Sequence, residues 1–306
     1  MKKLTVPPFL KVGDKVIIVS PSGRIDRHTL SQTQKIFNHW GLRATLSKHA
    51  AAMAGSFAGT ASMRYEDFQA AMDDDEARAI FCSRGGYGVV HFLDRLDFTR
   101  FRRHPKWLVG FSDISALHAL FQHQGFASLH APMGKHLITE PVDDPCTVYL
   151  RHILFGELPI YDISSHKLNI KGEAAGILRG GNMTVLNGLR ATPFDLPLAG
   201  TILFLEDIGE RPHTIERMFY NLKLSGDLSK LTGLIIGQFT EYNPTDSLLR
   251  QTLYESIADM VRGYGYPVCF DFPVGHVTNN LPLICGAEVN LIVEKHVTLQ
   301  HLIEKK

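Results

Sequence analysis

The first half of the chain repeats one pattern: an apolar run, a conspicuous turn, and then a stretch with helical spacing. The runs are "KVIIV", "AIFC" and "WLVG", and the turns that follow them lie at 20–23, 84–88 and 110–113. Strands that alternate with crossover helices form a parallel sheet with helices on both faces. Ligands bind such sheets beyond the carboxyl ends of the strands. We therefore expect these turns to converge on one crevice.

The chain changes character after Glu140, where two prolines flank an acidic pair in "EPVDDPC". Its 306 residues exceed the usual size of one domain, so two domains are expected. Strands outnumber helices towards the end, and the alternation over 288–302 predicts an antiparallel hairpin. We predict an α/β fold with a parallel-sheet domain over 1–145, a linker over 146–170 and a smaller mixed α/β domain over 171–306.

Composition argues against several classes of protein. The 32 Lys and Arg nearly cancel the 31 Asp and Glu, whereas nucleic-acid binding needs a clustered positive excess. Prolines and charges interrupt the N-terminal segment, so it is not typical of a signal peptide, and no stretch has the ~18 apolar residues of a membrane span. The four cysteines lack CxxC spacing and no HExxH occurs, so we expect buried thiols and neither metal nor cofactor. We expect a cytoplasmic protein with a small partner, which is neither nucleic acid nor membrane.

The stretch "VGFSDISALHALF" places a serine where a strand gives way at once to a helix. A sharp turn there would raise the hydroxyl of Ser112 above the sheet edge. It would also point the first free N–H groups of the helix, including that of Asp113, toward the group under attack. The stretch is similar to a nucleophile elbow, although the usual second glycine is absent. From this segment alone, the more ordinary alternative is that Ser112 or Asp113 is a plain N-cap.

A serine nucleophile needs a base and a third group that orients the base. Glu206 directly follows the apolar run "ILFL", so we expect it where a strand ends, although a surface carboxylate is an equally good interpretation. His276 follows a Pro-Val-Gly turn after another apolar run. Because the chain has 15 histidines, only this matching setting singles out His276.

Two glycine pairs follow other apolar runs. In "SRGGYG" the adjacent glycines permit backbone conformations in which N–H groups face a ligand, which suits an oxyanion hole. Dinucleotide binding is not indicated, because no G-x-G-x-x-G follows the first strand. The similar "LRGGN" is interpreted as structural, with Asn182 as a candidate donor to a pocket.

Taken in order along nearly the whole chain, these motifs resemble the LD-carboxypeptidase family of serine peptidases, whose relatives include the microcin C self-immunity hydrolases. The resemblance implies a flavodoxin-like N-terminal domain that carries the serine, a smaller C-terminal mixed α/β domain that carries Glu206 and His276, and an active site between them. It also suggests a homodimer. The stretches that carry it are "VSPSG", "FAGTASMRYEDFQAAMDDDEARAIFCSRGGYG", "GFSDISAL", "LRGGNMTVLNGLRATPF", "LFLEDIGERPHTIERM" and "PVGH".

The resemblance also assigns roles to single residues. It makes Ser112 the nucleophile, Glu206 the orienting carboxylate and His276 the general base. The family's oxyanion hole falls on the turn in "SRGGYG", with Gly86 as the first donor, and on the N–H of Asp113. No cofactor or metal is implied.

The implied reaction is hydrolysis of the bond between the L-centre of a diamino acid and the terminal D-alanine of a murein tetrapeptide. A carboxypeptidase must also bind a free carboxylate, for which Arg84 or an exposed helix N-terminus is the candidate. One alternative is a microcin immunity hydrolase, which cleaves an amide in a peptidyl nucleotide and carries aromatic residues that stack on the base. Against it, the only tryptophans are Trp40 and Trp107, neither in the second half. The other alternative is a non-catalytic two-domain solute-binding protein.

Overall fold

The computed structural model describes residues 4–241 and 247–303, and this part of the chain divides into two compact units. We call them the N-terminal unit and the C-terminal unit and describe each by itself. The N-terminal unit comprises Leu4–Leu158 and Leu281–Ile284, and the C-terminal unit comprises Pro159–Asn280 and the chain from Cys285 onward.

The stretch 146–170, predicted as a linker, contributes regular structure to both units. Helix α5 (Pro145–Leu154) lies in the N-terminal unit, and strand β6 (Ile160–Ser164) lies in the C-terminal unit. The proline and acidic pair interpreted as a boundary are the start of α5, where Asp144 accepts from the N–H of Thr147 and proline occupies the first turn. Both features are typical of a helix N-terminus, where unpaired N–H groups need acceptors.

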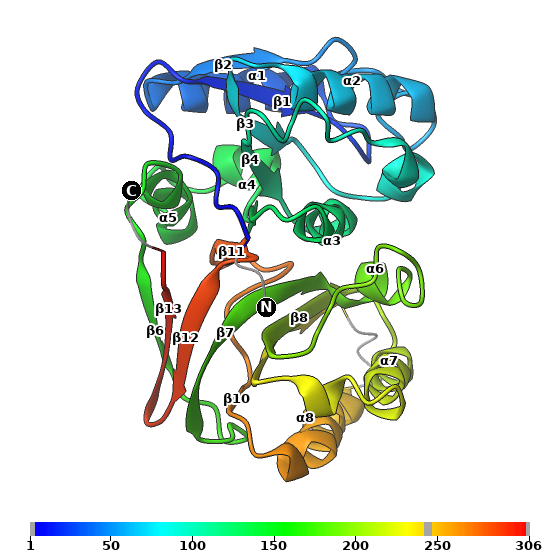
Figure 1. The fold of residues 1–306 in the computed structure, drawn as a ribbon, viewed down its shortest axis with the longest axis vertical. Coiled ribbons are helices and arrows are strands. Elements are labelled where there is room, and N and C mark those ends of the chain that lie inside the picture. The colour runs from blue at the N-terminus through cyan, green and yellow to red at the C-terminus, as the bar shows by residue number, and fades with distance from the viewer. Residues whose placement is uncertain (1–3, 242–246, 304–306) are drawn as a thin grey trace. The chain divides into compact units, whose positions relative to one another are not determined.

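The sheet of the N-terminal unit has six strands in the order β11-β5-β4-β3-β1-β2 (Figure 1). Pairs from β2 through β1, β3 and β4 to β5 are all parallel, so the order 2-1-3-4-5 is flavodoxin-like, as predicted. In chain order, the other elements of this unit are β1 (Lys15–Val19), α1 (Arg27–His39), β2 (Arg43–Leu46), α2 (Ala61–Asp73), β3 (Ala77–Cys82), η1 (Val89–His91), η2 (Leu93–Arg95), β4 (Trp107–Gly110), η3 (Ser112–Ile114), α3 (Ser115–His123), β5 (Ser128–His130), α4 (Gly134–Thr139) and β11 (Leu283–Cys285).

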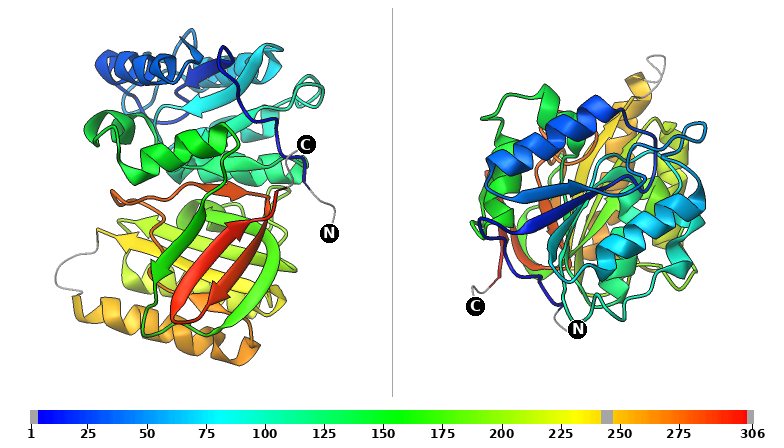
Figure 2. Two further views of the ribbon diagram at one scale, coloured as in Figure 1. Left: turned by 90° about the vertical axis from the view of Figure 1, so that its left-hand side faces the viewer. Right: turned by 90° about the horizontal axis from the view of Figure 1, so that it is seen from above.

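Helices α1 and α2 flank these strands on opposite sides (Figure 2). Each begins at a side chain that accepts a free N–H of the first turn: Asp26 caps α1 and Thr60 caps α2. The central strands β1, β3 and β4 are buried almost throughout, whereas the edge strand β2 is mostly exposed. Phe81 and Trp107 are fully buried in the core. A parallel sheet covered on both faces explains why its strands are continuous apolar runs instead of alternating ones.

Strand β11 joins this sheet beside β5 although it comes from the C-terminal half of the sequence. The chain therefore leaves the N-terminal unit after Leu158, returns at Leu281 and leaves again after Ile284. Sequence periodicity did not predict this return, because "LIC" is too short to indicate a partner sheet.

The C-terminal unit is built on a seven-stranded sheet in the order β10-β9-β8-β7-β12-β13-β6 (Figure 1). Strands β7 to β10 are parallel, whereas β12, β13 and β6 add antiparallel neighbours. The hairpin predicted over 288–302 is present as β12 and β13. The remaining elements are β7 (Gly172–Asn182), α6 (Met183–Asn187), β8 (Thr201–Ile208), α7 (Pro212–Leu224), η4 (Leu228–Lys230), β9 (Gly233–Thr240), α8 (Ser247–Val261), η6 (Arg262–Tyr264), β10 (Val268–Cys269), β12 (Glu288–Val293) and β13 (His296–His301).

The cysteines and the helices bear on two expectations from composition, buried thiols and no membrane span. All four cysteines are buried, as expected. Burial raises the pKa of the Cys269 thiol to about 12, so this thiol stays neutral near pH 7. Across residues 4–241 and 247–303, none of the helices combines the length and apolar character that crossing a bilayer requires.

Candidate active site

Ser112 lies in a sharp turn directly after β4. Its backbone φ is +66°, a left-handed conformation that costs a residue with a side chain about 1–2 kcal/mol. The preceding strand ends at Gly110, whose φ is +155°. Neither η3 nor α3 has a side-chain cap, so the interpretation of Ser112 or Asp113 as an N-cap is wrong. Strain retained at a polar residue is characteristic of functional sites.

The turn at 84–88 lies against the side chain of Ser112. A Cβ on Gly85 would come 2.8 Å from Ser112 Cβ and 3.0 Å from its Oγ, so only glycine permits this approach. Gly86, the predicted oxyanion donor, is the next residue and has φ of +118°; its α-carbon faces Gly23. Sequence reasoning could not tell Gly85 from Gly86, because both stand in one Gly-Gly pair.

Asp113 was predicted to act through its backbone N–H. The structure shows in addition that its carboxylate is buried, with 2% of the residue exposed, and accepts hydrogen bonds from two other segments of the N-terminal unit. Sequence reasoning missed this role because the donors lie far away in the sequence.

The buried imidazole of His118 holds the end of β4. Its Nε2 lies 2.8 Å from the carbonyl oxygen of Gly110, and its Nδ1 lies 2.8 Å from Ser128 Oγ. A carbonyl can only accept, so Nε2 carries the proton and Nδ1 accepts from the serine hydroxyl. Burial lowers the pKa of His118 to about 4, so the ring is neutral and its role is structural.

Arg84, the candidate for the substrate carboxylate, is exposed on the 84–88 turn. Its Nη1 donates to the carbonyl oxygen of Arg24 at 2.8 Å, which fixes the guanidinium over the neighbouring turn. The group is thus held at the surface of the N-terminal unit on the same turn as Gly86.

Glu206 lies within β8 and is completely buried, so a surface carboxylate is not what the structure shows. We expected it at the end of a strand, but β8 continues to Ile208. The register of β8 against β9 shifts between Leu205 and Asp207, because β9 carries one extra residue opposite Glu206. Bulges re-aim side chains next to functional sites, and no periodicity in the sequence announces them.

His276 is hydrogen-bonded to Glu206. Its Nδ1 lies 2.7 Å from Glu206 Oε2, and 16% of the imidazole side chain is exposed. A carboxylate can only accept, so Nδ1 is the protonated nitrogen. Burial by itself lowers the pKa of His276, but the hydrogen bond and the negative charge of Glu206 outweigh burial and raise that pKa above its ordinary value.

Gly275 makes room for this pair. Its φ is +129°, and a Cβ there would lie 2.9 Å from Glu206 Oε2. Its N–H donates to Oδ1 of the buried Asn280 at 2.9 Å, which fixes the turn that carries His276. Asn280 was not singled out from the sequence, although the "HVTNN" stretch after the turn carries the side-chain type that commonly stabilises turns.

Asn182 ends β7 and caps α6. Its Oδ1 accepts from the N–H of Val185 at 3.1 Å, and its Nδ2 donates to Asp207 Oδ1 at 2.9 Å. Asp207 in turn accepts from the N–H and hydroxyl of Thr184. This network supports the structural interpretation of "LRGGN", while a pocket role for Asn182 remains a prediction.

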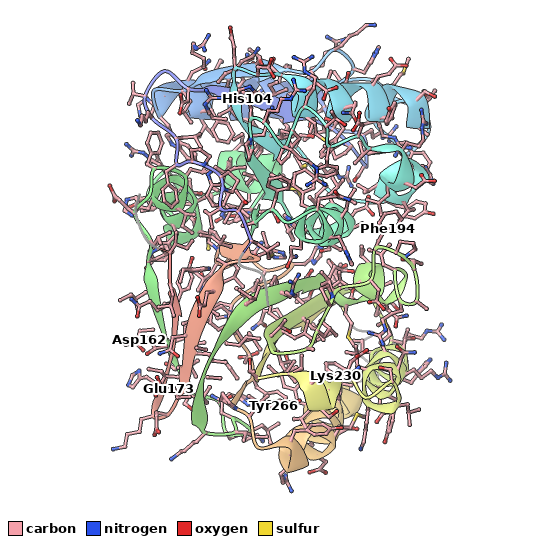
Figure 3. The ribbon with its side chains drawn as sticks, in the orientation of Figure 1. His104, Asp162, Glu173, Phe194, Lys230 and Tyr266 are labelled. Carbon is pink, nitrogen blue, oxygen red and sulfur yellow. The ribbon has the colours of Figure 1, made fainter. Side chains whose placement is uncertain are left out.

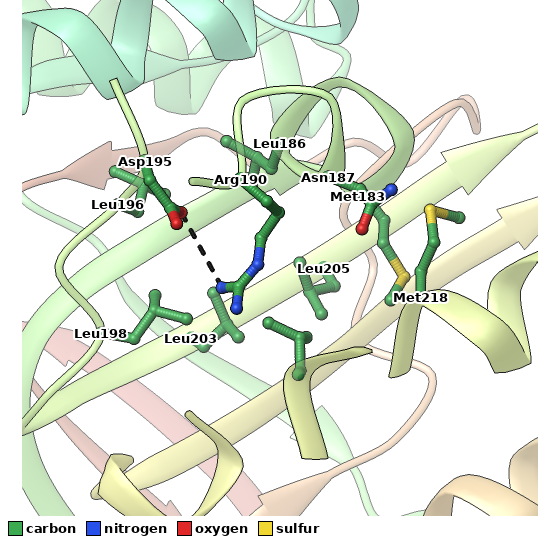
Figure 4. Close-up of a pocket in the computed structure, with 11 residues that line it drawn as sticks. Met183, Leu186, Asn187, Arg190, Asp195, Leu196, Leu198, Leu203, Leu205 and Met218 are labelled. Carbon is green, nitrogen blue, oxygen red and sulfur yellow. Dashed lines mark ion pairs between the residues drawn. The ribbon is translucent and has the colours of Figure 1, made fainter. Parts of the chain in front are cut away.

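A cavity of about 30 Å³ lies beside strand β8 in the C-terminal unit (Figure 4). Leu203 and Leu205 line it, and an ion pair between Arg190 and Asp195 with N···O of 3.8 Å closes one side. Side chains alternate along a strand, so these leucines lie on the face opposite Phe204 and away from the Glu206 pair. The cavity has room for about one water molecule and is a packing feature.

Two models of known protein families together match most of the length of the chain. Residues 16–131 match the LD-carboxypeptidase N-terminal domain, and residues 175–291 match the LD-carboxypeptidase C-terminal domain. The chain belongs to the LD-carboxypeptidase family. The resemblance drawn from its motifs is thereby confirmed, and this LD-carboxypeptidase family member is a hydrolase of the serine-peptidase type.

Individual relatives agree with the family match. The probable murein peptide carboxypeptidase of Bacillus subtilis (strain 168) is 32% identical, over 92% of this chain and 90% of its own length. The murein tetrapeptide carboxypeptidase of Pseudomonas aeruginosa is 30% identical, over 88% of this chain and 90% of its own. The solved structure of MccF in complex with glutamyl sulfamoyl guanosine aligns with a TM-score of 0.87 over 100% of both chains at 20% identity, which shows a shared fold.

Proposed function

We propose that this enzyme is a serine LD-carboxypeptidase that removes the terminal D-alanine from murein tetrapeptides, with Ser112, His276 and Glu206 as its triad. The observation that carries the proposal is the 2.7 Å hydrogen bond between His276 and the buried Glu206, in a family that includes a murein tetrapeptide carboxypeptidase. A carboxylate bound to one imidazole nitrogen orients the other nitrogen for proton transfer to and from a serine.

In the proposed first step, Ser112 Oγ attacks the carbonyl carbon of the diamino acid while His276 Nε2 takes the hydroxyl proton. The C–N bond to D-alanine then breaks, and the imidazolium gives that proton to the departing amine. Water attacks the resulting ester with the same help from His276, which releases the tripeptide and restores the serine. The mechanism requires Ser112 of the N-terminal unit to reach His276 of the C-terminal unit in the working enzyme.

The negative oxygen that forms during each attack needs preorganised N–H donors. We assign this role to the amides of Gly86 and Asp113. The assignment is supported by the positive φ of Ser112, the residue at which η3 begins, and by the close approach that Gly85 allows between the two turns. We assign the free carboxylate of the substrate to Arg84, which is exposed on the same turn as Gly86.

The rival substrate is a peptidyl nucleotide. The fold shared with MccF favours this rival as much as the murein substrate, but base stacking needs an accessible aromatic residue. Trp40 and Trp107 are buried in the N-terminal unit. In the C-terminal unit, Phe194 is half-buried in the segment that joins α6 to β8 (Figure 3) and is the candidate for stacking.

The deciding experiment incubates the enzyme with L-Ala-D-Glu-diaminopimelate-D-Ala and, separately, with a peptidyl sulfamoyl adenosine. Products are identified by mass spectrometry, and Ser112→Ala is the matched control. We expect D-alanine from the tetrapeptide and a loss of about 10³-fold or more in turnover for Ser112→Ala. Release of the nucleoside product alone would favour the rival. If Ser112→Ala processed the tetrapeptide like the parent, the proposed nucleophile would be wrong.

We propose also that the enzyme works in the cytoplasm as a homodimer. These two proposals follow from the family resemblance. The proposed partner is a small murein peptide, and we propose no binding to nucleic acid or to a membrane. Sedimentation equilibrium tests the assembly, and a monomer at micromolar concentration would contradict it. Cell fractionation tests the compartment.

A further inference from the structure

The carboxylate of Asp113 joins three turns of the N-terminal unit. Its Oδ2 accepts from Ser22 Oγ at 2.6 Å and from the backbone N–H of Val89 at 3.0 Å. Ser22 stands in the turn after β1, and Val89 follows the 84–88 turn. Because Asp113 is covalently next to Ser112, one buried carboxylate ties the nucleophile's turn to both of the others.

Arg64 on α2 supplies the opposite charge beneath this junction. Only 2% of Arg64 is exposed, and the negative charge of Asp113 opposes the lowering of the Arg64 pKa by burial. Its Nη2 lies 3.0 Å from His91 Nδ1. A Cβ on Gly88 would lie 2.0 Å from Arg64 Nη1, so the guanidinium packs directly against the backbone of the 84–88 turn.

A backbone bond completes the connection. The N–H of Gly23, next to Ser22, donates to the carbonyl oxygen of Gly85 at 3.0 Å. Gly85 is the residue whose missing side chain admits Ser112. Hydrogen bonds and chain neighbours therefore connect Asp113 through Ser22 and Gly23 to Gly85, which packs closely against Ser112.

We propose that the Asp113 side chain is a positioning residue which, through its bonds to Ser22 and Val89, fixes the 84–88 turn at the distance from Ser112 that oxyanion binding requires. This inference rests on the proposed function in taking Ser112 as the nucleophile and the 84–88 turn as part of the oxyanion hole. The position of the 84–88 turn relative to Ser112 is important for the rate, because displacing a reacting group by about 1 Å can cost ~100-fold.

The same unit contains a matched control. Asp67 is a buried aspartate that also accepts from a serine hydroxyl and a backbone N–H: Ser47 Oγ at 2.6 Å and His49 N at 2.8 Å. These partners follow β2, at the opposite edge of the sheet order from β4 and β5. Asp67→Asn therefore repeats the chemical change of Asp113→Asn without touching the turns around Ser112.

The test measures the rate at which an alkyl fluorophosphonate labels Ser112, together with kcat and KM for the tetrapeptide. For Asp113→Asn we expect labelling and kcat to fall by about 10²-fold while KM changes by less than about threefold, since only the tetrahedral state needs the oxyanion donors. For Ser22→Ala, which removes one of the two bonds, we expect a fall of about tenfold. Asp67→Asn should label like the parent.

The outcomes separate this inference from the proposed function. If Asp113→Asn and Ser22→Ala label Ser112 at the parental rate, the positioning role is overturned while the nucleophile stands. If Asp67→Asn loses as much as Asp113→Asn, the effect is general destabilisation and the inference is wrong. If the parent releases no D-alanine but is labelled at Ser112, only the substrate fails. If Asp113→Asn does not fold, Ser22→Ala alone decides.

Discussion

The turn that carries Ser112 and the strand that carries Glu206 use a buried carboxylate in different ways. In the N-terminal unit, Asp113 accepts from the Ser22 hydroxyl and from the backbone N–H of Val89, so its carboxylate links two other segments of the chain. In the C-terminal unit, Glu206 accepts from His276, so its charge raises the pKa of a side chain that can move a proton. In the proposed mechanism, the first carboxylate determines the geometry of the turns around Ser112, and the second determines the basicity of His276.

The two regions share one device, a glycine pressed against the functional side chain. Gly85 lies against Ser112, and Gly275 lies against Glu206, each where a Cβ would come within 3 Å. Gly275 also has a positive φ of +129°, whereas the φ of Gly85 lies outside this left-handed region. An alanine at Gly85 is therefore a purely steric change, which makes it the cleaner probe of geometry.

The largest expected effect tests basicity. Glu206→Gln should lower kcat/KM by about 10³-fold, because the amide can donate to His276 Nδ1 and stabilise the wrong tautomer. The pH profile should change as well: in the parent, kcat/KM should rise through a pKa above 6.5, and the variant should lose that upward shift. Steady-state kinetics between pH 5 and 9 measure both. An unchanged acidic limb would show that Glu206 does not control His276.

An intermediate effect tests geometry. Gly85→Ala should lower kcat by about 10²-fold, because the new methyl group forces Ser112 or its turn to move. The pH profile should stay parental, since Glu206 and His276 lie in the other unit. Gly263→Ala is the control, because a Cβ at Gly263 meets nothing within 4 Å. A pH shift in Gly85→Ala would break the proposed division between the two units.

The smallest expected effect is on stability. Glu206 raises the folded-state pKa of His276 above its unfolded value of 6.5, so the folded protein binds the proton more tightly. The stabilising contribution is then complete below about pH 6.5 and is lost as the pH rises through the folded pKa. Urea unfolding of the parent and of His276→Gln should differ more at pH 6 than at pH 9. The difference in the free energy of unfolding between the two proteins should be smaller than about 1.5–3 kcal/mol, the range for a hydrogen bond to a charged group.

Much of the fold could be predicted because hydrophobic patterns in consecutive residues indicate individual strands and helices. The apolar runs before Ser20 and Gly110 gave strands, and the alternation over 288–302 gave a hairpin. Two features escaped for physical reasons. Strand β11 is three residues long and belongs to the sheet through long-range pairing, and the extra residue of β9 opposite Glu206 shows only in the pairing of β8 with β9.

The site divides in the same way. Ser112, Glu206 and His276 could be named because each follows an apolar run or a glycine turn, features that are written in consecutive residues. The roles of Ser22, Arg64 and Asn280 could not, because a hydrogen bond to a distant segment leaves no mark on its neighbours in the chain.

The sequence by itself determined the family, the order of the candidate residues and the parallel sheet of the first half, since motifs and hydrophobic periods are local. Tertiary structure alone decided that Oδ2 of Asp113 accepts from both Ser22 and Val89, and that Glu206 lies 2.7 Å from His276. Such contacts depend on register and close packing, where a shift of one residue or one methyl group changes the neighbour.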